Sequence, residues 1–201
     1  MLVLASASPR RQELLCNARI PFVVQPAHIP EDPLPGESAR DCAERLAREK
    51  ALAVARERPK DCVLGADTVV VVDGQILGKP SDTKDAARML RLLSGREHQV
   101  ITGVCLALRG ESFAASETTL VAFDQLTDQD IADYVATGEP MDKAGAYAIQ
   151  GIASRWIPRI EGDYANVVGL PVALAFRMLR EIGCQLPVAS SQQNPNSPAE
   201  N

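Results

Sequence analysis

Short apolar runs and longer stretches of helical periodicity alternate along this chain. The run Leu2–Ala5 is typical of a short buried strand, and the pattern from Pro9 predicts a helix directly after it. Residues 62–72 form a nearly continuous β-branched run, which predicts the most buried strand of the protein. Asp67 interrupts this run, although aspartate is rare in strands.

The remaining elements follow from the same patterns. Strands are expected at 21–25, 75–78, 98–108 and 112–123, helices at 37–58, 81–93 and 127–135, and a closing helix from residue 171. A proline-rich loop covers 26–36, and a loop rich in glycine and small residues covers 138–151. We expect Trp156 to pack within a following strand and His98 to be a hydrogen-bonded structural histidine.

Composition indicates a globular chain that is long enough for one sizeable domain or two small lobes. Of its 201 residues, 46% are hydrophobic and 23% are charged. No apolar run approaches the roughly 20 residues of a membrane span, so we expect no membrane segment and a cytoplasmic location. We assign residues 1–186 to a single domain and the Ser/Gln/Asn/Pro-rich residues 187–201 to a disordered tail.

Charge and cysteine content exclude several classes of function. The 26 acidic and 21 basic residues make the chain net acidic, which disfavours broad nucleic-acid binding, so an anionic ligand would need a local basic cluster. The five cysteines are scattered and form no CxxC motif. They therefore predict small core residues rather than a disulfide framework or a zinc site.

Positive charge is concentrated where the first helix begins. Ser8 is a suitable N-cap and Pro9 suits the first helical position, while Arg10 and Arg11 follow within the first turn. Because the free N–H groups and the dipole of a helix start already favour an anion, the two guanidinium groups predict a phosphate site. The alternative is an ordinary capped helix with two solvated arginines.

Four further charged residues suggest a common site. Lys50 falls in the apolar stripe of helix 37–58, where it either extends to the rim or reaches a phosphate in a cleft. Asp67 should lie at an opening, beside a metal, water or cation. Lys79 follows closely, and Glu31 lies in the proline-rich loop. Carboxylates and fixed cations of this kind suit Mg²⁺ or Mn²⁺ together with a polyphosphate.

Seven segments stand out together along the chain, namely SASPRRQELL, RLAREKA, LGADTVV, GKP, LSGREHQVITG, DKAGAYAIQG and NVVGLP. In this order they resemble the Maf-like proteins, a family of house-cleaning nucleotide pyrophosphatases, and the resemblance covers about residues 2–183. It implies an α/β fold like that of the inosine triphosphate pyrophosphatases: a mixed twisted sheet with flanking helices and two lobes around a central cleft. It also implies a homodimer and the hydrolysis of a nucleoside triphosphate to monophosphate and pyrophosphate with a divalent cation.

The resemblance also implies roles for individual residues. Asp67 would be the catalytic residue, as acceptor of the water proton or as a metal ligand, and Glu31 would help to hold the metal. The residues implied to hold the triphosphate are Ser8, Arg11, Lys50 and Lys79.

Three positions separate the branches of the family by substrate, and here they are Arg10, Thr68 and Gln150. These residues resemble the branch specific for dTTP and UTP. The branch acting on 7-methyl-GTP typically has tryptophan, glutamine and glutamate instead. Glutamine suits uracil or thymine because an amide both donates and accepts hydrogen bonds. The alternatives are a 7-methyl-GTP pyrophosphatase and a nucleotide-binding regulator of septum formation.

Overall fold

The computed structural model describes residues 1–184, which are built around a mixed seven-stranded sheet. The strand order is β2-β1-β3-β5-β6-β7, with β4 paired to β3. The strands are β1 (Leu2–Leu4), β2 (Val23–Val24), β3 (Cys62–Val72), β4 (Gln75–Leu77), β5 (Glu97–Leu108), β6 (Glu111–Ala122) and β7 (Arg159–Glu161). β1 is parallel to β2 and β3, whereas all other pairings are antiparallel.

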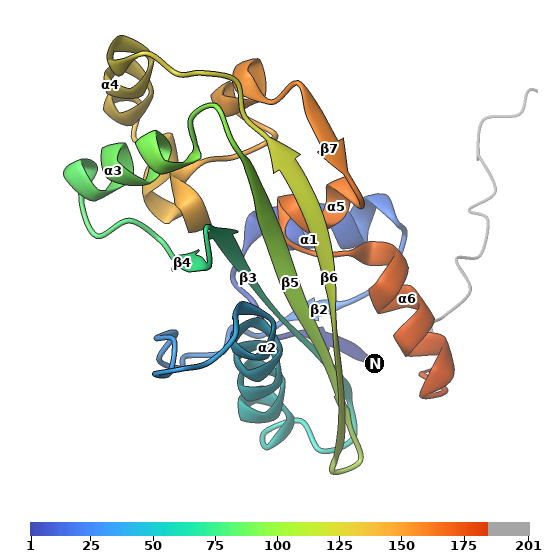
Figure 1. The fold of residues 1–201 in the computed structure, drawn as a ribbon. Coiled ribbons are helices and arrows are strands. Elements are labelled where there is room, and N and C mark those ends of the chain that lie inside the picture. The colour runs from blue at the N-terminus through green and yellow to red at the C-terminus, as the bar shows by residue number, and fades with distance from the viewer. Residues whose placement is uncertain (185–201) are drawn as a thin grey trace, which may run out of the picture.

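Helices cover both faces of the sheet and one of its ends (Figure 1). α2 (Ala39–Ala55) packs on one face, while α1 (Pro9–Asn17), α5 (Tyr164–Val168) and α6 (Val172–Glu181) lie on the other. α3 (Thr83–Leu93), α4 (Asp128–Ala136) and the short 3-10 helices η1 (Glu139–Asp142), η2 (Ala144–Ala146) and η3 (Ile152–Trp156) gather at the end of the sheet. Within residues 1–184, none of the helices combines the length and apolar character that a bilayer crossing requires.

The core is divided in the way that the expected two lobes require. One cluster of buried residues joins α3, α4 and the 3-10 segments to the adjacent ends of β3, β5 and β6. The other clusters lie beneath α1, α2 and α6. This division leaves the middle of β3 at the junction of the two parts.

The pleat of β3 divides two adjacent site residues between the faces of the sheet. Successive side chains of a strand point to opposite faces. Ala66 packs in the cluster with α6, whereas Val69 packs with α2. Asp67 therefore faces α2, and Thr68 faces the layer that contains α1 and α5.

Two glycines allow α2 to lie very close to this sheet. A Cβ atom at Gly65 of β3 would lie 2.2 Å from the carbonyl oxygen of Ala47, and one at Gly103 of β5 would lie 2.2 Å from that of Ala43. Atoms cannot approach so closely, so any larger residue would push the helix away. The close contact sets how far Lys50 of α2 must reach to meet Asp67.

Most predicted elements are confirmed, with local corrections. The prediction of a strand at Trp156 is wrong: this residue ends η3, where its ring packs edge-on against Tyr134. The short elements α5 and β7 were not predicted. His98 is confirmed as structural, because it is buried with Nε2 2.8 Å from the Tyr147 hydroxyl, and burial lowers its pKa to about 4. The predicted tail, 187–201, and the domain end at residue 186 lie outside the described residues.

Candidate active site

A cleft of about 980 Å³ opens where the two parts of the protein meet. Its walls come from the β1–α1 connection, the proline-rich loop, α2, the middle of β3, the segment after β4, and loops around residues 141–150 and 167–169. Every site residue predicted from sequence lines it, namely Ser8, Arg10, Arg11, Glu31, Lys50, Asp67, Thr68, Lys79 and Gln150. The structure thus brings all nine side chains to one cavity.

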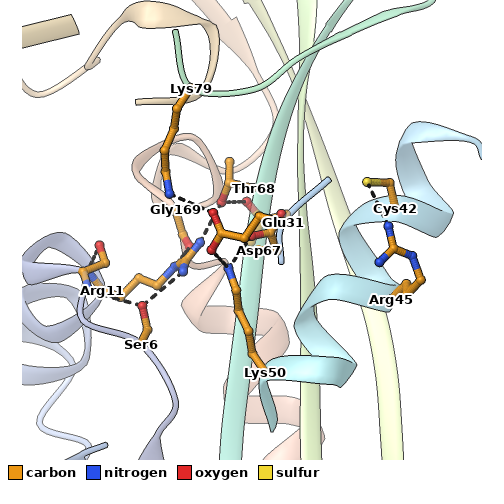
Figure 2. A network of polar contacts seen from close by, with 12 residues as sticks. Ser6, Arg11, Glu31, Cys42, Arg45, Lys50, Asp67, Thr68, Lys79 and Gly169 are labelled. Atoms are coloured by element: carbon orange, nitrogen blue, oxygen red, sulfur yellow. Dashed lines mark hydrogen bonds and ion pairs between the residues drawn. The ribbon is translucent and has the colours of Figure 1, made fainter. Parts of the chain in front are cut away.

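Four charged side chains, Glu31, Lys50, Asp67 and Lys79, form a quartet in the cleft (Figure 2). The Nζ atom of Lys50 lies 2.6 Å from Oδ1 of Asp67 and 2.6 Å from Oε1 of Glu31. The Nζ atom of Lys79 donates to Oε2 of Glu31 at 2.8 Å. The side chain of Lys50 is 7% exposed and that of Lys79 is 59% exposed, so the quartet runs from the protein interior to open solvent.

The quartet favours the ionised form of Glu31. Partial burial raises the pKa of this carboxyl group, but hydrogen bonds and charges from Lys50 and Lys79 outweigh the effect and bring its pKa to about 2. Glu31 is therefore a carboxylate at neutral pH and forms ion pairs with both lysines. A polyphosphate that enters the cleft meets cations already held in place by the protein's own carboxylates.

Arg11 forms a second cationic centre, which is fixed from three sides (Figure 2). Its Nε donates to the carbonyl oxygen of Gly169 at 2.7 Å, its Nη1 to Oγ of Ser6 at 3.2 Å and its Nη2 to Oγ1 of Thr68 at 3.2 Å. Burial lowers the pKa of Arg11, while the carboxylates of Asp67 and Glu31 oppose this change. Ser8 caps α1 as predicted by accepting the backbone N–H of Arg11 at 3.5 Å.

The three residues assigned to substrate choice lie around the same cleft in different settings. Arg10 is partly exposed, with Nη1 3.4 Å from Oδ2 of Asp142. Gln150 is exposed at the cleft wall. The hydroxyl of Thr68, in contrast, contacts Arg11 and lies 2.9 Å from that of Thr102. Thr68 thus lies beside a predicted phosphate-binding group.

A pair of side chains braces the loop that carries Gln150. The Tyr134 hydroxyl donates to Oε1 of Glu139 at 2.8 Å and accepts the backbone N–H of Ala148 at 3.2 Å. The same carboxylate oxygen accepts the backbone N–H of Ile152 at 3.1 Å. The backbone is therefore held two residues before and two residues after Gln150.

Of the three residues that orient Arg11, only Thr68 was assigned a role from sequence, and that role was substrate choice. Ser6 and Gly169 belong to the quoted segments SASPRRQELL and NVVGLP, but no spacing rule links Gly169 to Arg11, 158 positions away. Thr102 lies in the expected strand 98–108, to whose side chains no chemical role was assigned. The signal available in the sequence was that Thr102 is a polar residue on a strand face that must be buried.

The centre of the cleft offers two acidic side chains, Glu31 and Asp67, to the implied metal. Within residues 1–184, no group of three or more histidine, cysteine, aspartate or glutamate side chains could hold a metal ion. Glu31 and Asp67 nevertheless share Lys50 and so present two carboxylates to one region. Mg²⁺ is commonly held by one or two carboxylates together with substrate phosphates. The donor set therefore fits a hard divalent cation that binds together with a phosphate ligand.

Comparisons with known proteins agree on a single family. Residues 1–182 match the family model described as Maf-like protein. A dTTP/UTP pyrophosphatase of Koribacter versatilis is 58% identical over 182 residues, covering 90% of this chain and 94% of the relative. The dTTP/UTP pyrophosphatases of Symbiobacterium thermophilum and Geobacter sulfurreducens are each 53% identical, covering 90% of this chain and 94% and 96% of the relatives.

A solved structure supports the fold. The Ham1 protein of Staphylococcus aureus matches 90% of this chain and 98% of its own chain, with a TM-score of 0.50 and 15% sequence identity. At this identity the match concerns the fold alone. It confirms the expected α/β architecture of a mixed sheet with flanking helices.

Proposed function

Because the chain belongs to the Maf-like protein family, we propose that it hydrolyses dTTP and UTP to the nucleoside monophosphate and pyrophosphate. Relatives named for this activity share 53% and 58% of its sequence over nearly their full length. One observation carries the proposal: the cleft holds Lys50 between Asp67 and Glu31, close to a fixed arginine. Such an enzyme would have a house-cleaning role, removing modified pyrimidine nucleotides.

The cationic side chains hold the triphosphate in this proposal. Arg11 provides one guanidinium, Lys50 and Lys79 provide the two ammonium groups of the quartet, and the α1 start capped by Ser8 adds the positive end of its helix dipole. Together they neutralise charge on the phosphate oxygens and on the leaving pyrophosphate. Phosphoryl chemistry depends mainly on such positioning and charge stabilisation.

Asp67 is proposed to act on the attacking water. Its Oδ1 accepts from Lys50, while its Oδ2 has no hydrogen-bond partner within residues 1–184. That second oxygen is available to accept a proton from a water aimed at the α-phosphorus. The side chain is only 11% exposed, so it is held in place rather than moving freely in solvent.

We propose that Glu31 and Asp67 also hold a divalent cation, either Mg²⁺ or Mn²⁺. Both side chains provide the hard oxygen donors that these ions prefer. When bound, the ion would stabilise negative charge that develops on the phosphoryl oxygens. Because both carboxylates contact Lys50, binding of the cation would compete with that ammonium for the same oxygens.

Selection of the base is assigned to the open side of the cleft. Arg10 and Gln150 line this cavity together with Thr68. The amide of Gln150 both donates and accepts, as the Watson-Crick edge of uracil or thymine requires. The hydrogen bonds at Ala148 and Ile152 hold the backbone on both sides of Gln150.

The assembly and location of the enzyme belong to the same proposal. We expect a homodimer in the cytoplasm, with a nucleoside triphosphate rather than nucleic acid as the ligand, in keeping with the net charge of −5. Light scattering coupled to gel filtration measures the oligomeric state directly. A single monomer peak at micromolar concentration would contradict the dimer.

A substrate panel tests the proposed activity. Pyrophosphate release is measured from dTTP, UTP, CTP, GTP and 7-methyl-GTP, with Mg²⁺ or Mn²⁺ and without metal. The proposal predicts turnover of dTTP and UTP that depends on the added metal. Preference for 7-methyl-GTP would overturn the roles of Arg10, Thr68 and Gln150. Binding of nucleotides without hydrolysis in the presence of either metal would instead support the alternative function, a nucleotide-binding regulator of septum formation.

A further inference from the structure

A chain of hydrogen bonds leads from Arg11 into the interior of the sheet. Nη2 of Arg11 donates to Oγ1 of Thr68 at 3.2 Å, and that hydroxyl lies 2.9 Å from Oγ1 of Thr102. Thr68 and Thr102 are directly opposite one another on β3 and β5. Oγ1 of Thr102 in turn lies 3.1 Å from the backbone carbonyl oxygen of Asn166 in α5.

The direction of every bond in this chain follows from the chemistry of its groups. A carbonyl oxygen can only accept, so the hydroxyl of Thr102 donates its single hydrogen to Asn166. Thr102 must then accept from Thr68, whose hydrogen is thereby directed inward. Thr68 is left with lone pairs only, one of which accepts from Arg11.

This arrangement also determines which N–H groups of Arg11 remain available to a ligand. The group has five N–H bonds, and three of them are used for Gly169, Ser6 and Thr68, one on each nitrogen. Two N–H bonds, one on Nη1 and one on Nη2, have no partner within residues 1–184. N–H groups on the two terminal nitrogens of an arginine can bind two oxygens of a phosphate.

We propose that Thr102 is a positioning residue, which directs the Thr68 hydrogen inward and thereby holds Arg11 with two N–H groups presented to the triphosphate. This role rests on the proposed function in one respect only, namely the identity of the anion. Thr102 is fully buried and does not line the cleft, so it acts through Thr68 and Arg11. Without the Thr102 hydroxyl, the hydroxyl of Thr68 can rotate and point its hydrogen toward Arg11. The hydroxyl hydrogen and the N–H groups of Arg11 then repel one another.

A matched set of variants separates this role from ordinary stability. Thr102→Val removes the hydroxyl but keeps the shape, and Thr102→Ser restores the hydroxyl. Thr119→Val is the structural control, because the buried Thr119 hydroxyl bonds to the backbone of Asp163 and to the amide of Asn166 but contacts neither Thr68 nor Arg11. Thr68→Val interrupts the same series of hydrogen bonds at a partly exposed residue, and it serves as the test if Thr102→Val fails to fold.

The readouts are calorimetric affinity for inorganic tripolyphosphate and kcat/KM for dTTP, with melting temperatures measured in parallel. Thr102→Val and Thr68→Val are expected to weaken both quantities about tenfold, the effect of losing one hydrogen bond to a charged group. Thr102→Ser should stay within about twofold of the wild type. Thr119→Val should melt earlier, at least as much as Thr102→Val, yet bind tripolyphosphate within about twofold of the wild type.

Other outcomes would contradict the positioning role of Thr102 or the proposed function. Wild-type affinity in Thr102→Val or Thr68→Val, or equal losses of affinity in Thr102→Val and Thr119→Val, would overturn the positioning role. A wild-type protein that binds tripolyphosphate but does not hydrolyse dTTP would refute the proposed function alone, since the affinities would still decide the role of Thr102. A wild-type protein that does not bind tripolyphosphate would overturn the positioning role itself.

Discussion

The ammonium nitrogen of Lys50 lies 2.6 Å from Oδ1 of Asp67, and both side chains are almost fully enclosed. Lysine and aspartate are seldom buried unless they are paired. The pairing is made possible by Gly65, which lets α2 approach β3 until its backbone nearly touches the strand. The Lys50–Asp67 pair is therefore a consequence of how the helix packs, and removing the charge of Lys50 should affect stability.

The first prediction concerns the removal of Lys50. Lys50→Met leaves the carboxylate of Asp67 enclosed without its cation, so the free energy of unfolding should fall by about 3 kcal/mol. Activity toward dTTP should fall about 100-fold, because a phosphate contact in the cleft is lost as well. Urea denaturation and steady-state kinetics measure the two effects.

Lys79→Met serves as the matched variant for this comparison. Lys79 is 59% exposed, and its ion pair with Glu31 should contribute less than about 1 kcal/mol. We expect Lys79→Met to lose activity while its unfolding free energy stays close to that of the wild type. Equal losses of stability in the two variants would contradict the enclosed pairing of Lys50 with Asp67.

The second prediction concerns acid stability and Glu31. The pKa of Glu31 lies near 2, below the ordinary value of 4.5, so the folded state binds its proton less readily than the unfolded state does. The stabilisation from Glu31 is therefore complete above about pH 4.5 and is lost as the pH falls toward 2. The difference in unfolding free energy between wild type and Glu31→Gln should shrink over this window. A difference that is as large at pH 3 as at pH 7 would be inconsistent with the ion pairs of Glu31.

The third prediction tests the close approach of α2. Gly103→Ala places a Cβ atom against the carbonyl of Ala43, so the unfolding free energy should fall by about 1–3 kcal/mol. Gly78→Ala is the control, because no atom lies within 4 Å of the added carbon. Chemical denaturation of the two variants gives the comparison. Unchanged stability in Gly103→Ala would show that the helix can move away freely.

The fourth prediction concerns the loop that carries Gln150. Tyr134→Phe removes the hydroxyl that joins Glu139 to the backbone of Ala148. Losing these two bonds should lower the unfolding free energy by about 1–3 kcal/mol and raise KM for dTTP several-fold, with a smaller change in kcat. Tyr164→Phe, at an exposed tyrosine of α5, is the control and should resemble the wild type. An unchanged KM in Tyr134→Phe would mean that the brace does not position the loop.

Much of the fold could be predicted because local patterns and packing agree. The run 62–72 predicted β3 with the observed bounds, and Ser38 and Thr127 cap helices near the expected positions. The short elements α5 and β7 were missed because each has only three to five residues, too few to show a period. Trp156 was misplaced for the same reason, since η3 is a brief 3-10 segment.

The composition of the site was also readable, but its internal connections were not. Lys50 and Asp67 could be found from sequence because each breaks the pattern of its own element. The contacts that orient Arg11 come from Ser6, Thr68 and Gly169, and the last two residues meet Arg11 only in the folded chain. The pairing of Glu31 with both lysines likewise depends on how the proline-rich loop folds over the cleft.

The most direct test of the account is pyrophosphate release from dTTP by the wild type and by Asp67→Asn, with melting curves and tripolyphosphate binding recorded for both proteins. Asparagine keeps the shape of the side chain but cannot accept the proton of water. We predict that the variant stays folded and still binds tripolyphosphate, while its turnover falls by about 100-fold or more. Turnover within a few-fold of the wild type would contradict the assignment of Asp67 as the catalytic residue of this cleft.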